Sequence, residues 1–270
     1  MKKTRLAFPL KKSRSQHFLQ DKEILRFEAE RLEVEGEDVL EIGAGDGRLS
    51  EQLLSQNPSS LTLVELDERW AEHSRKRFAK DSRVKILSQD ILSLPDSPAP
   101  APLIAGNIPY QITSSILLKL GRWKPKRALL CVQKEVAERI SAPPGTSEYG
   151  RLSVFVQANF ETKLLGEVAR GLFTPPPKVD SALVLLTRKK RLAPLPAHFE
   201  TLTAALFSHR LQTVAHALLG ERRRWGWSKD EAREQAGRLK ISRKRVFELT
   251  PAEAASLAQI LPAPSAGPNE

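Results

Sequence analysis

The 270-residue sequence has few of the features that mark secreted or membrane proteins. It contains a single cysteine, Cys131, so an intramolecular disulfide is excluded, which suits a reducing compartment. No apolar run approaches the roughly 20 residues of a membrane span. The basic N-terminus also lacks the apolar core of a signal peptide. We therefore expect a cytoplasmic protein with no membrane partner.

Acidic residues are scarce in two segments of the chain. Residues 1–14 hold six Lys/Arg and no acid, and residues 188–262 hold fifteen Lys/Arg against seven Asp/Glu. The remainder has 22 basic and 25 acidic residues, although the whole chain carries a net charge of +11. A single charge run usually marks a solvated surface. Here the excess positive charge is concentrated in two blocks, which favours a polyanionic partner. Nucleic acid is favoured over an acidic membrane.

Short apolar runs alternate with helical patterns in the middle of the chain. Strands are expected at 38–42, 61–65, 84–87, 103–105 and 128–133, and helices at 47–55, 68–79, from 113, and at 134–141. Strands separated by helices predict an α/β fold with a parallel sheet covered on both faces. The segments 152–160 and 181–187 are predicted as further strands at the edge of this sheet.

The pattern becomes purely helical from about residue 192. Helices are expected at 199–206, 211–219, 229–238 and 251–260, so a domain boundary is predicted near 188–197. The predicted organisation is a basic N-terminal arm (1–14), an α/β domain (15–190), a small all-α basic domain (191–262) and a disordered tail (263–270).

Three glycines follow the first expected strand, in the segment EIGAGDG at 41–47. Glycines let a backbone approach a ligand closely, although alone they mark a structural turn about as often. The spacing is GxGxG rather than the GxGxxG of dinucleotide sites. Glu65 ends the next strand, where a carboxylate can accept both hydroxyls of a ribose, and Asp90 ends the third, where it can accept an adenine amino group. Together they indicate S-adenosylmethionine, an adenosine ligand without a diphosphate.

The segment GNIPY at 106–110 ends the fourth strand at the same edge. The N6 amine of adenine is a poor nucleophile because its lone pair is delocalised into the ring. The amide oxygen of Asn107, with the backbone carbonyl of Ile108 or Pro109, is placed to accept the two amine hydrogens and aim the lone pair. Tyr110 is placed to stack on the base. The competing interpretation, in which Asn107 caps a turn and Tyr110 is core, becomes the weaker one beside the glycine loop.

These motifs resemble the adenine-N6 rRNA methyltransferases, namely the KsgA/Dim-type dimethyladenosine transferases and their Erm relatives. Further segments support the resemblance, which runs from about residue 11 to 187: SQHFL at 15–19, VQKEVA at 132–137 and FTPPPKVDS at 173–181. It implies a Rossmann-like class I S-adenosylmethionine-dependent methyltransferase domain followed by a small all-α C-terminal domain. It implies no metal.

The resemblance also assigns roles to individual positions of this chain. Cofactor contacts fall on Gln16, His17, Leu19, Gly43, Gly45, Glu65, Asp90 and Asn107. The catalytic set is Asn107, Pro109, Tyr110 and Phe173, with Tyr110 and Phe173 stacking on a flipped-out adenine.

Two positions depart from the family pattern. His17 stands where the family has Asn, and an imidazole there predicts that cofactor affinity differs between pH 6 and 8. The segment 207–216 lacks two cations and an Asn of the family's usual C-terminal helix. The Arg/Lys triplets at 222–224 and 243–245 are candidate replacements. The competing interpretation is that these triplets are simply solvated. The RNA-binding candidates are Lys11, Lys12, Arg14, Lys134, Arg210, Arg222, Arg223, Arg224, Arg243, Lys244 and Arg245.

The expected function is therefore N6,N6-dimethylation of adenines in small-subunit rRNA during ribosome biogenesis. The expected substrate is the rRNA of an immature small subunit, and the expected enzyme is a monomer. The sequence leaves two alternatives open. One is an Erm-like methylase of large-subunit rRNA, and the other is a non-catalytic RNA-binding assembly or transcription factor on the same fold. A nicotinamide dehydrogenase is disfavoured by the GxGxG spacing.

Overall fold

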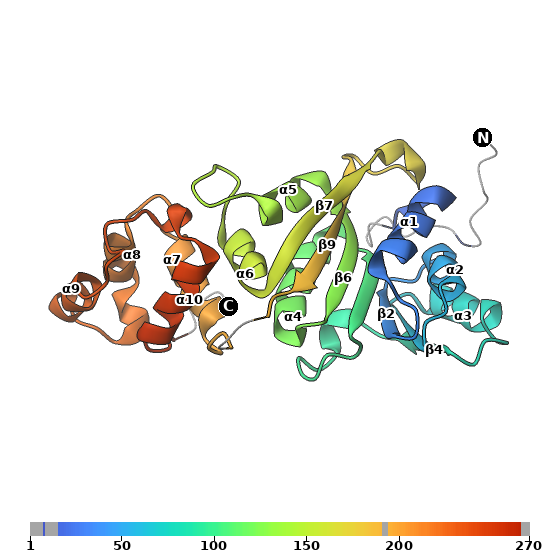
Figure 1. Cartoon of the computed structure of the whole chain (residues 1–270), viewed down its shortest axis with the longest axis horizontal. Coiled ribbons are helices and arrows are strands. Elements are labelled where there is room, and N and C mark those ends of the chain that lie inside the picture. Colours follow the sequence, from blue (N-terminus) through green and yellow to red (C-terminus); the bar gives the residue numbers. More distant parts are fainter. Residues whose placement is uncertain (1–7, 9–15, 191–193, 266–270) are drawn as a thin grey trace. The chain divides into compact units, whose positions relative to one another are not determined.

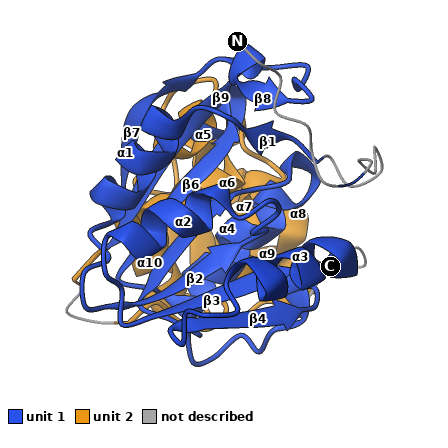
Figure 2. Ribbon diagram, turned by 90° about the vertical axis from the view of Figure 1, so that its right-hand side faces the viewer, with its two compact units in different colours: residues 1–137, 161–188 blue, residues 138–160, 189–270 orange. Residues whose placement is uncertain are grey.

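The computed structural model describes residues 8, 16–190 and 194–265. The predicted N-terminal arm, with Lys11, Lys12 and Arg14, therefore lies outside the described residues, apart from Phe8. The chain forms two compact units, residues 1–137 with 161–188 and residues 138–160 with 189–270 (Figure 2). The chain passes between the units at 137/138, 160/161 and 188/189, whereas the sequence analysis expected one boundary near 188–197.

Unit 1 is built on a seven-stranded sheet in the order β4-β3-β2-β5-β6-β9-β7 (Figure 1). The pairs β2–β3, β3–β4, β2–β5 and β5–β6 are parallel, and β9 is antiparallel to β6. This is the class I methyltransferase fold. The strands are β2 (Asp38–Ile42), β3 (Ser60–Glu65), β4 (Val84–Ser88), β5 (Leu103–Asn107), β6 (Arg127–Gln133), β7 (Phe160–Val168) and β9 (Ser181–Arg188).

Helices alternate with these strands along the chain, as the sequence pattern predicted. They are α1 (Lys22–Leu32), α2 (Arg48–Ser55), α3 (Glu68–Arg77), α4 (Thr113–Trp123) and α5 (Lys134–Ser141), which crosses into unit 2, with short 3-10 helices η2 (Ile91–Ser93), η3 (Tyr110–Ile112) and η4 (Arg170–Leu172). Asp21 caps α1 by accepting the backbone N–H groups of Glu23 and Ile24. Alternate side chains of the central strands, such as Leu63 and Leu103, pack with α1 and α2 in one apolar cluster.

A second, two-stranded sheet joins segments far apart in the sequence. β1 (Phe18–Leu19) pairs antiparallel with β8 (Phe173–Thr174), so that Leu19 lies opposite Phe173. The Gln20 N–H extends this pairing by donating to the Leu172 carbonyl at 2.8 Å. The motifs SQHFL and FTPPPKVDS are therefore held side by side.

Unit 2 is helical and contains the basic C-terminal segment. Its elements beyond α5 are α6 (Arg151–Asn159), α7 (Phe199–Phe207), α8 (Val214–Glu221), η5 (Arg222–Trp225), α9 (Lys229–Gly237), η6 (Val246–Glu248) and α10 (Pro251–Ile260). The Tyr149 hydroxyl, buried in this unit, donates to the Leu249 carbonyl at 2.8 Å. Residues 263–265 of the predicted disordered tail are described, and the Ser265 N–H donates to the Arg224 carbonyl at 2.7 Å. The rest of that tail lies outside the described residues.

The strand predicted at 152–160 is wrong, because residues 152–159 lie in helix α6 and only Phe160 belongs to a strand. Short apolar runs with β-branched and aromatic residues do not distinguish a strand from a helix buried on most sides. The Gly150 N–H donates to the Ser153 hydroxyl at the start of α6, and Val154 and Val156 are both fully buried. The strand in this region is β7, which begins only at Phe160. It was missed because most of its side chains are polar or partly exposed.

No helix in the described part of the chain is long and apolar enough to cross a membrane.

Candidate active site

The glycine loop lies between β2 and α2, as the motif predicted. Gly43, Gly45 and Gly47 all have positive φ, at +73°, +54° and +78°, a region that favours glycine. A Cβ at Gly45 would also collide with the ring of Phe18, whereas a Cβ at Gly43 would meet open space. The loop is thus shaped by backbone conformation and by close packing against β1.

Glu65 ends β3 and is joined to this loop. One carboxylate oxygen accepts the Gly45 N–H at 3.0 Å and the other accepts the Asp67 N–H at 2.8 Å. Its side chain is 8% exposed and lines the cavity described next. Asp90 follows β4, is exposed, and caps η2 by accepting the Leu92 N–H at 2.9 Å. Both acids lie at the carboxyl edge of the sheet, where successive parallel strands end.

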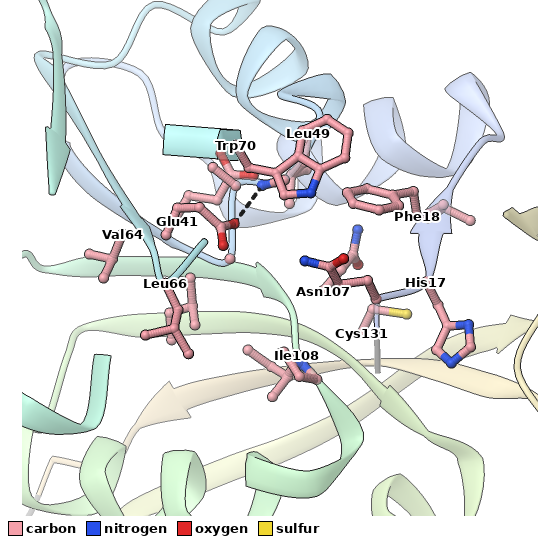
Figure 3. Close-up of a pocket in the computed structure, with 18 of the residues that line it drawn as sticks. His17, Phe18, Glu41, Leu49, Val64, Leu66, Trp70, Asn107, Ile108 and Cys131 are labelled. Carbon is pink, nitrogen blue, oxygen red and sulfur yellow. Dashed lines mark hydrogen bonds between the residues drawn. The ribbon is translucent and has the colours of Figure 1, made fainter. Parts of the chain in front are cut away.

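A cavity of about 250 Å³ opens at this edge, within unit 1 (Figure 3). It brings together every predicted catalytic and cofactor residue: Gln16, His17, Leu19, Gly43, Gly45, Glu65, Asp90, Asn107, Pro109, Tyr110 and Phe173. These residues come from six separate segments of the chain. The structure therefore gathers into one concave site the positions predicted from local motifs and from the family resemblance.

Asn107 is the last residue of β5 and points into this cavity (Figure 3). Gly106 before it is required by packing, since a Cβ there would lie 2.8 Å from the Ile42 carbonyl oxygen of the neighbouring strand. The side-chain Oδ1 of Asn107 is buried and accepts no hydrogen bond from the described residues. A buried acceptor left unpaired costs free energy, so Oδ1 is poised for a donor from a ligand.

Tyr110 is the first residue of η3, and both its hydroxyl and its ring contact other residues. Its hydroxyl lies 2.7 Å from the Ser181 hydroxyl, and burial raises the pKa of Tyr110, so the phenol stays neutral at physiological pH. The ring of His17 stacks on it, with 5.8 Å between centroids and 26° between planes. His17 Nδ1 in turn lies 2.8 Å from the carbonyl oxygen of Pro175. His17 therefore borders the aromatic side of the cavity.

Two acidic residues of unit 1, Glu41 of β2 and Glu28 of α1, are buried. Burial is the largest cause that raises the pKa of Glu41 to about 8, opposed by a hydrogen bond from Ser50, whose hydroxyl is 2.6 Å from the carboxylate. Burial likewise raises the pKa of Glu28 well above its usual range, with a smaller contribution from Glu41. Glu41 lines the cavity, and we expect it to be largely protonated at neutral pH.

The RNA-binding candidates differ in how far they are already engaged. Lys134 forms an ion pair with Glu167 at 2.6 Å. In unit 2, Arg210 donates to the Ser147 carbonyl at 2.8 Å and lies over the ring of Phe247. Neither residue is a freely extended surface cation.

The basic triplets at 222–224 and 243–245 each contain both engaged and exposed side chains. Arg224 pairs with Glu221 at 2.7 Å, and Lys244 pairs with Glu253 at 2.8 Å. Arg222 is partly buried and donates to the Leu219 carbonyl at 3.1 Å. The exposed members, which form no ion pair among the described residues, are Arg223, Arg243 and Arg245.

Ser181 and Trp70 are among the cavity residues that sequence reasoning missed. Ser181 belongs to a motif that the sequence analysis quoted, yet only the fold places its hydroxyl beside Tyr110. Trp70 lies on the first turn of α3 with no motif around it, and nothing in its neighbours indicated that it would face a ligand site.

Comparisons with known proteins identify relatives of this chain among the rRNA adenine methyltransferases. A family model described as ribosomal RNA adenine dimethylase matches residues 7–246. The probable ribosomal RNA small subunit methyltransferase A of Methanopyrus kandleri is 37% identical over 249 residues, covering 90% of this chain and 89% of the relative. The ribosomal RNA small subunit methyltransferase A of Thermotoga petrophila is 44% identical over 181 residues, covering 67% of this chain and 69% of the relative.

Solved structures agree on the fold. A dimethyladenosine transferase from Plasmodium falciparum superposes with a TM-score of 0.77 at 26% identity, covering 89% of this chain and 95% of that one. The 23S rRNA methyltransferase ErmE superposes with a TM-score of 0.64 at 28% identity, covering 90% of this chain and 99% of that one.

Proposed function

Because the chain belongs to the ribosomal RNA adenine dimethylase family, we propose that it transfers methyl groups from S-adenosyl-L-methionine to N6 of adenines in small-subunit rRNA, twice per base. The observation that carries this proposal is the buried Oδ1 of Asn107, which faces the cavity without a hydrogen-bond donor among the described residues.

The cavity fits the cofactor in the character of its polar groups. Glu65 offers carboxylate oxygens at the strand end where ribose hydroxyls are expected, and Gly43 leaves open space for close approach to the backbone. Asp90 stands at the end where an adenine amino group is expected. Gln16 and Leu19 line the side formed by β1. When bound, S-adenosylmethionine supplies an electrophilic methyl group.

Asn107 and the adjoining backbone prepare the acceptor amine. Oδ1 accepts one amine hydrogen, which withdraws the nitrogen lone pair from the ring and directs it across the cavity. The Pro109 carbonyl already accepts the Ile112 N–H at 3.1 Å, so we assign the second hydrogen to the carbonyl of Ile108. No strong base is needed, because the amine becomes acidic as it gains the methyl group and releases its proton.

Tyr110 and Phe173 hold the base between them in this proposal. Both line the cavity, and Phe173 is fixed by its pairing with Leu19 across β1 and β8. Stacking is worth about 1–3 kcal/mol per base, which offsets part of the cost of extruding an adenine from its helix. His17 lies directly before β1 and stacks on Tyr110 at the wall of the cavity.

The rRNA is bound outside the cavity by cationic side chains, in line with the net charge of +11. Among the candidates, Arg223, Arg243 and Arg245 are exposed and are the strongest for phosphate contacts. We also propose that the protein acts as a monomer in the cytoplasm and that its substrate is an immature small subunit.

The test offers labelled S-adenosylmethionine with unmethylated small and large ribosomal subunits in separate reactions. The rRNA is digested and scored for mono- and dimethyladenosine. We expect dimethyladenosine from the small subunit only. Label in the large subunit would support an Erm-like methylase, for which the fold of ErmE is the supporting observation. Bound cofactor with no label in either subunit would support a non-catalytic assembly factor.

A further inference from the structure

Trp70 is a buried residue whose polar atom has no partner in the described part of the chain. It lies on the first turn of α3, five residues after Glu65, and its side chain is 0% exposed. Its indole Nε1 is buried and donates no hydrogen bond to any described residue. Buried indole N–H groups usually find an acceptor, because an unmade hydrogen bond costs about 1–3 kcal/mol.

Two of the other tryptophans show how the fold normally satisfies this group. Trp123 Nε1 donates to the Pro95 carbonyl at 2.7 Å, and Trp225 Nε1 donates to the Pro262 carbonyl at 2.8 Å. Both use a nearby backbone carbonyl of a proline. Trp70 differs from them in its location, because it lines the cavity assigned to the cofactor.

The ring of Trp70 is held in place by packing. Its centroid lies 4.9 Å from that of Phe18 and 5.1 Å from that of Phe8, which meets it edge-on. Figure 3 shows the indole beside Phe18, with its nitrogen turned toward the interior of the cavity. The orientation of the N–H group is thus set before any ligand arrives.

We propose that Trp70 is a further cofactor-binding residue, whose Nε1–H donates a hydrogen bond to an oxygen of S-adenosylmethionine. An indole N–H only donates, so its partner is an acceptor. The cofactor offers two kinds of oxygen, the ribose oxygens and the methionine carboxylate. No described residue accepts the Trp70 N–H, so an oxygen of the bound cofactor is the acceptor that we assign to it. This inference rests on the proposed function, which places the cofactor in this cavity.

The first test measures S-adenosylhomocysteine binding to the full chain by calorimetry, for wild type and Trp70→Phe. Phenylalanine keeps an aromatic ring between Phe8 and Phe18 but removes the N–H. We expect the Kd to rise about five- to tenfold, the effect of one neutral hydrogen bond. Trp123→Phe is the matched control, since it removes a satisfied indole away from the cavity, and its Kd should stay within about twofold of wild type. Equal Kd values for Trp70→Phe and wild type would overturn the inference.

The second test identifies the oxygen and does not depend on the variant folding. Wild-type protein with ¹⁵N-labelled tryptophan gives an indole signal for each of the four tryptophans. On addition of S-adenosylhomocysteine, the Trp70 signal should shift and its proton should exchange more slowly with solvent. An unaltered Trp70 signal would contradict the proposal. The same change with 5′-methylthioadenosine, which lacks the amino acid part, would identify a ribose oxygen, and its absence would identify the carboxylate.

The two proposals fail in distinguishable ways. If wild type binds no S-adenosylhomocysteine at all, the assignment of the cavity to the cofactor fails. If wild type binds it and the Trp70 indole is unaffected, only the role of Trp70 fails.

Discussion

The imidazole of His17 stacks on the ring of Tyr110, with 5.8 Å between their centroids and 26° between their planes. His17 Nδ1 is also 2.8 Å from the Pro175 carbonyl oxygen, which holds the ring over the phenol. His17 stands where the family pattern has Asn, and the structure places it beside the residue proposed to stack on the target base. This contact suggests a role in base positioning as well as in cofactor binding.

Replacing His17 with Ala should therefore raise KM for rRNA about three- to tenfold, because the loss of one stacking neighbour is worth about 1 kcal/mol. The Kd for S-adenosylhomocysteine should change less. Steady-state kinetics on small subunits and calorimetry separate the two effects. His216→Ala, which changes a histidine of unit 2, serves as the control. A larger loss of cofactor affinity than of KM would place His17 primarily in the cofactor site.

Asn107→Ala should lower kcat by about 10²- to 10³-fold, the usual effect of removing one group that stabilises developing charge. Asn107→Asp should retain more activity, because it keeps an oxygen acceptor at the same position. Single-turnover methylation with saturating rRNA measures both. Binding of rRNA should remain within about threefold of wild type, since the residue lies inside the cavity. Equal losses of turnover in the Ala and Asp variants would argue against the acceptor role.

Charge reversal of Arg223, Arg243 or Arg245 should weaken rRNA binding in a salt-dependent way. Each exposed cation that contacts a phosphate should reduce the slope of log K against log salt by about 1. Filter binding between 50 and 200 mM salt measures this slope. Lys244→Gln is the matched control, because Lys244 is already paired with Glu253 at 2.8 Å, and it should leave the slope nearly unchanged. A slope that no exposed variant alters would remove these residues from the rRNA contact.

Glu28→Gln should stabilise the protein more at pH 8 than at pH 5. Both carboxylate oxygens of Glu28 are buried without a partner among the described residues, and burial raises its pKa well above the usual 4.5. Above pH 4.5 the unfolded chain therefore binds fewer protons than the folded one, so the free energy of unfolding falls as pH rises. Glutamine removes this dependence because it stays neutral.

Urea unfolding at pH 5, 6, 7 and 8 measures this difference. Glu30→Gln, an exposed position on the same helix, should give a curve parallel to that of wild type. Parallel curves for Glu28→Gln and wild type would mean that Glu28 ionises as freely in the folded protein as in the unfolded one.

The sequence by itself determined the class of fold and indicated which candidate residues meet at one edge of the sheet. Residues at the ends of parallel strands meet at one edge of the sheet, so the glycine loop, Glu65, Asp90 and Asn107 were predictable neighbours from local pattern alone. The helices of the C-terminal segment were predictable from periodicity and caps, as with α10, which begins at Pro251 after its Thr250 cap. These features depend on interactions between residues close in sequence.

The tertiary structure decided what depends on distant packing. It made residues 151–159 a helix rather than a strand, because the burial of an apolar run is set by its neighbours and not by its own period. It also decided which basic side chains are already paired, as when Lys244 forms an ion pair with Glu253 of α10. The ring contacts of His17 with Tyr110 and of Phe18 with Trp70 join segments more than 50 residues apart, for which a single sequence carries no signal.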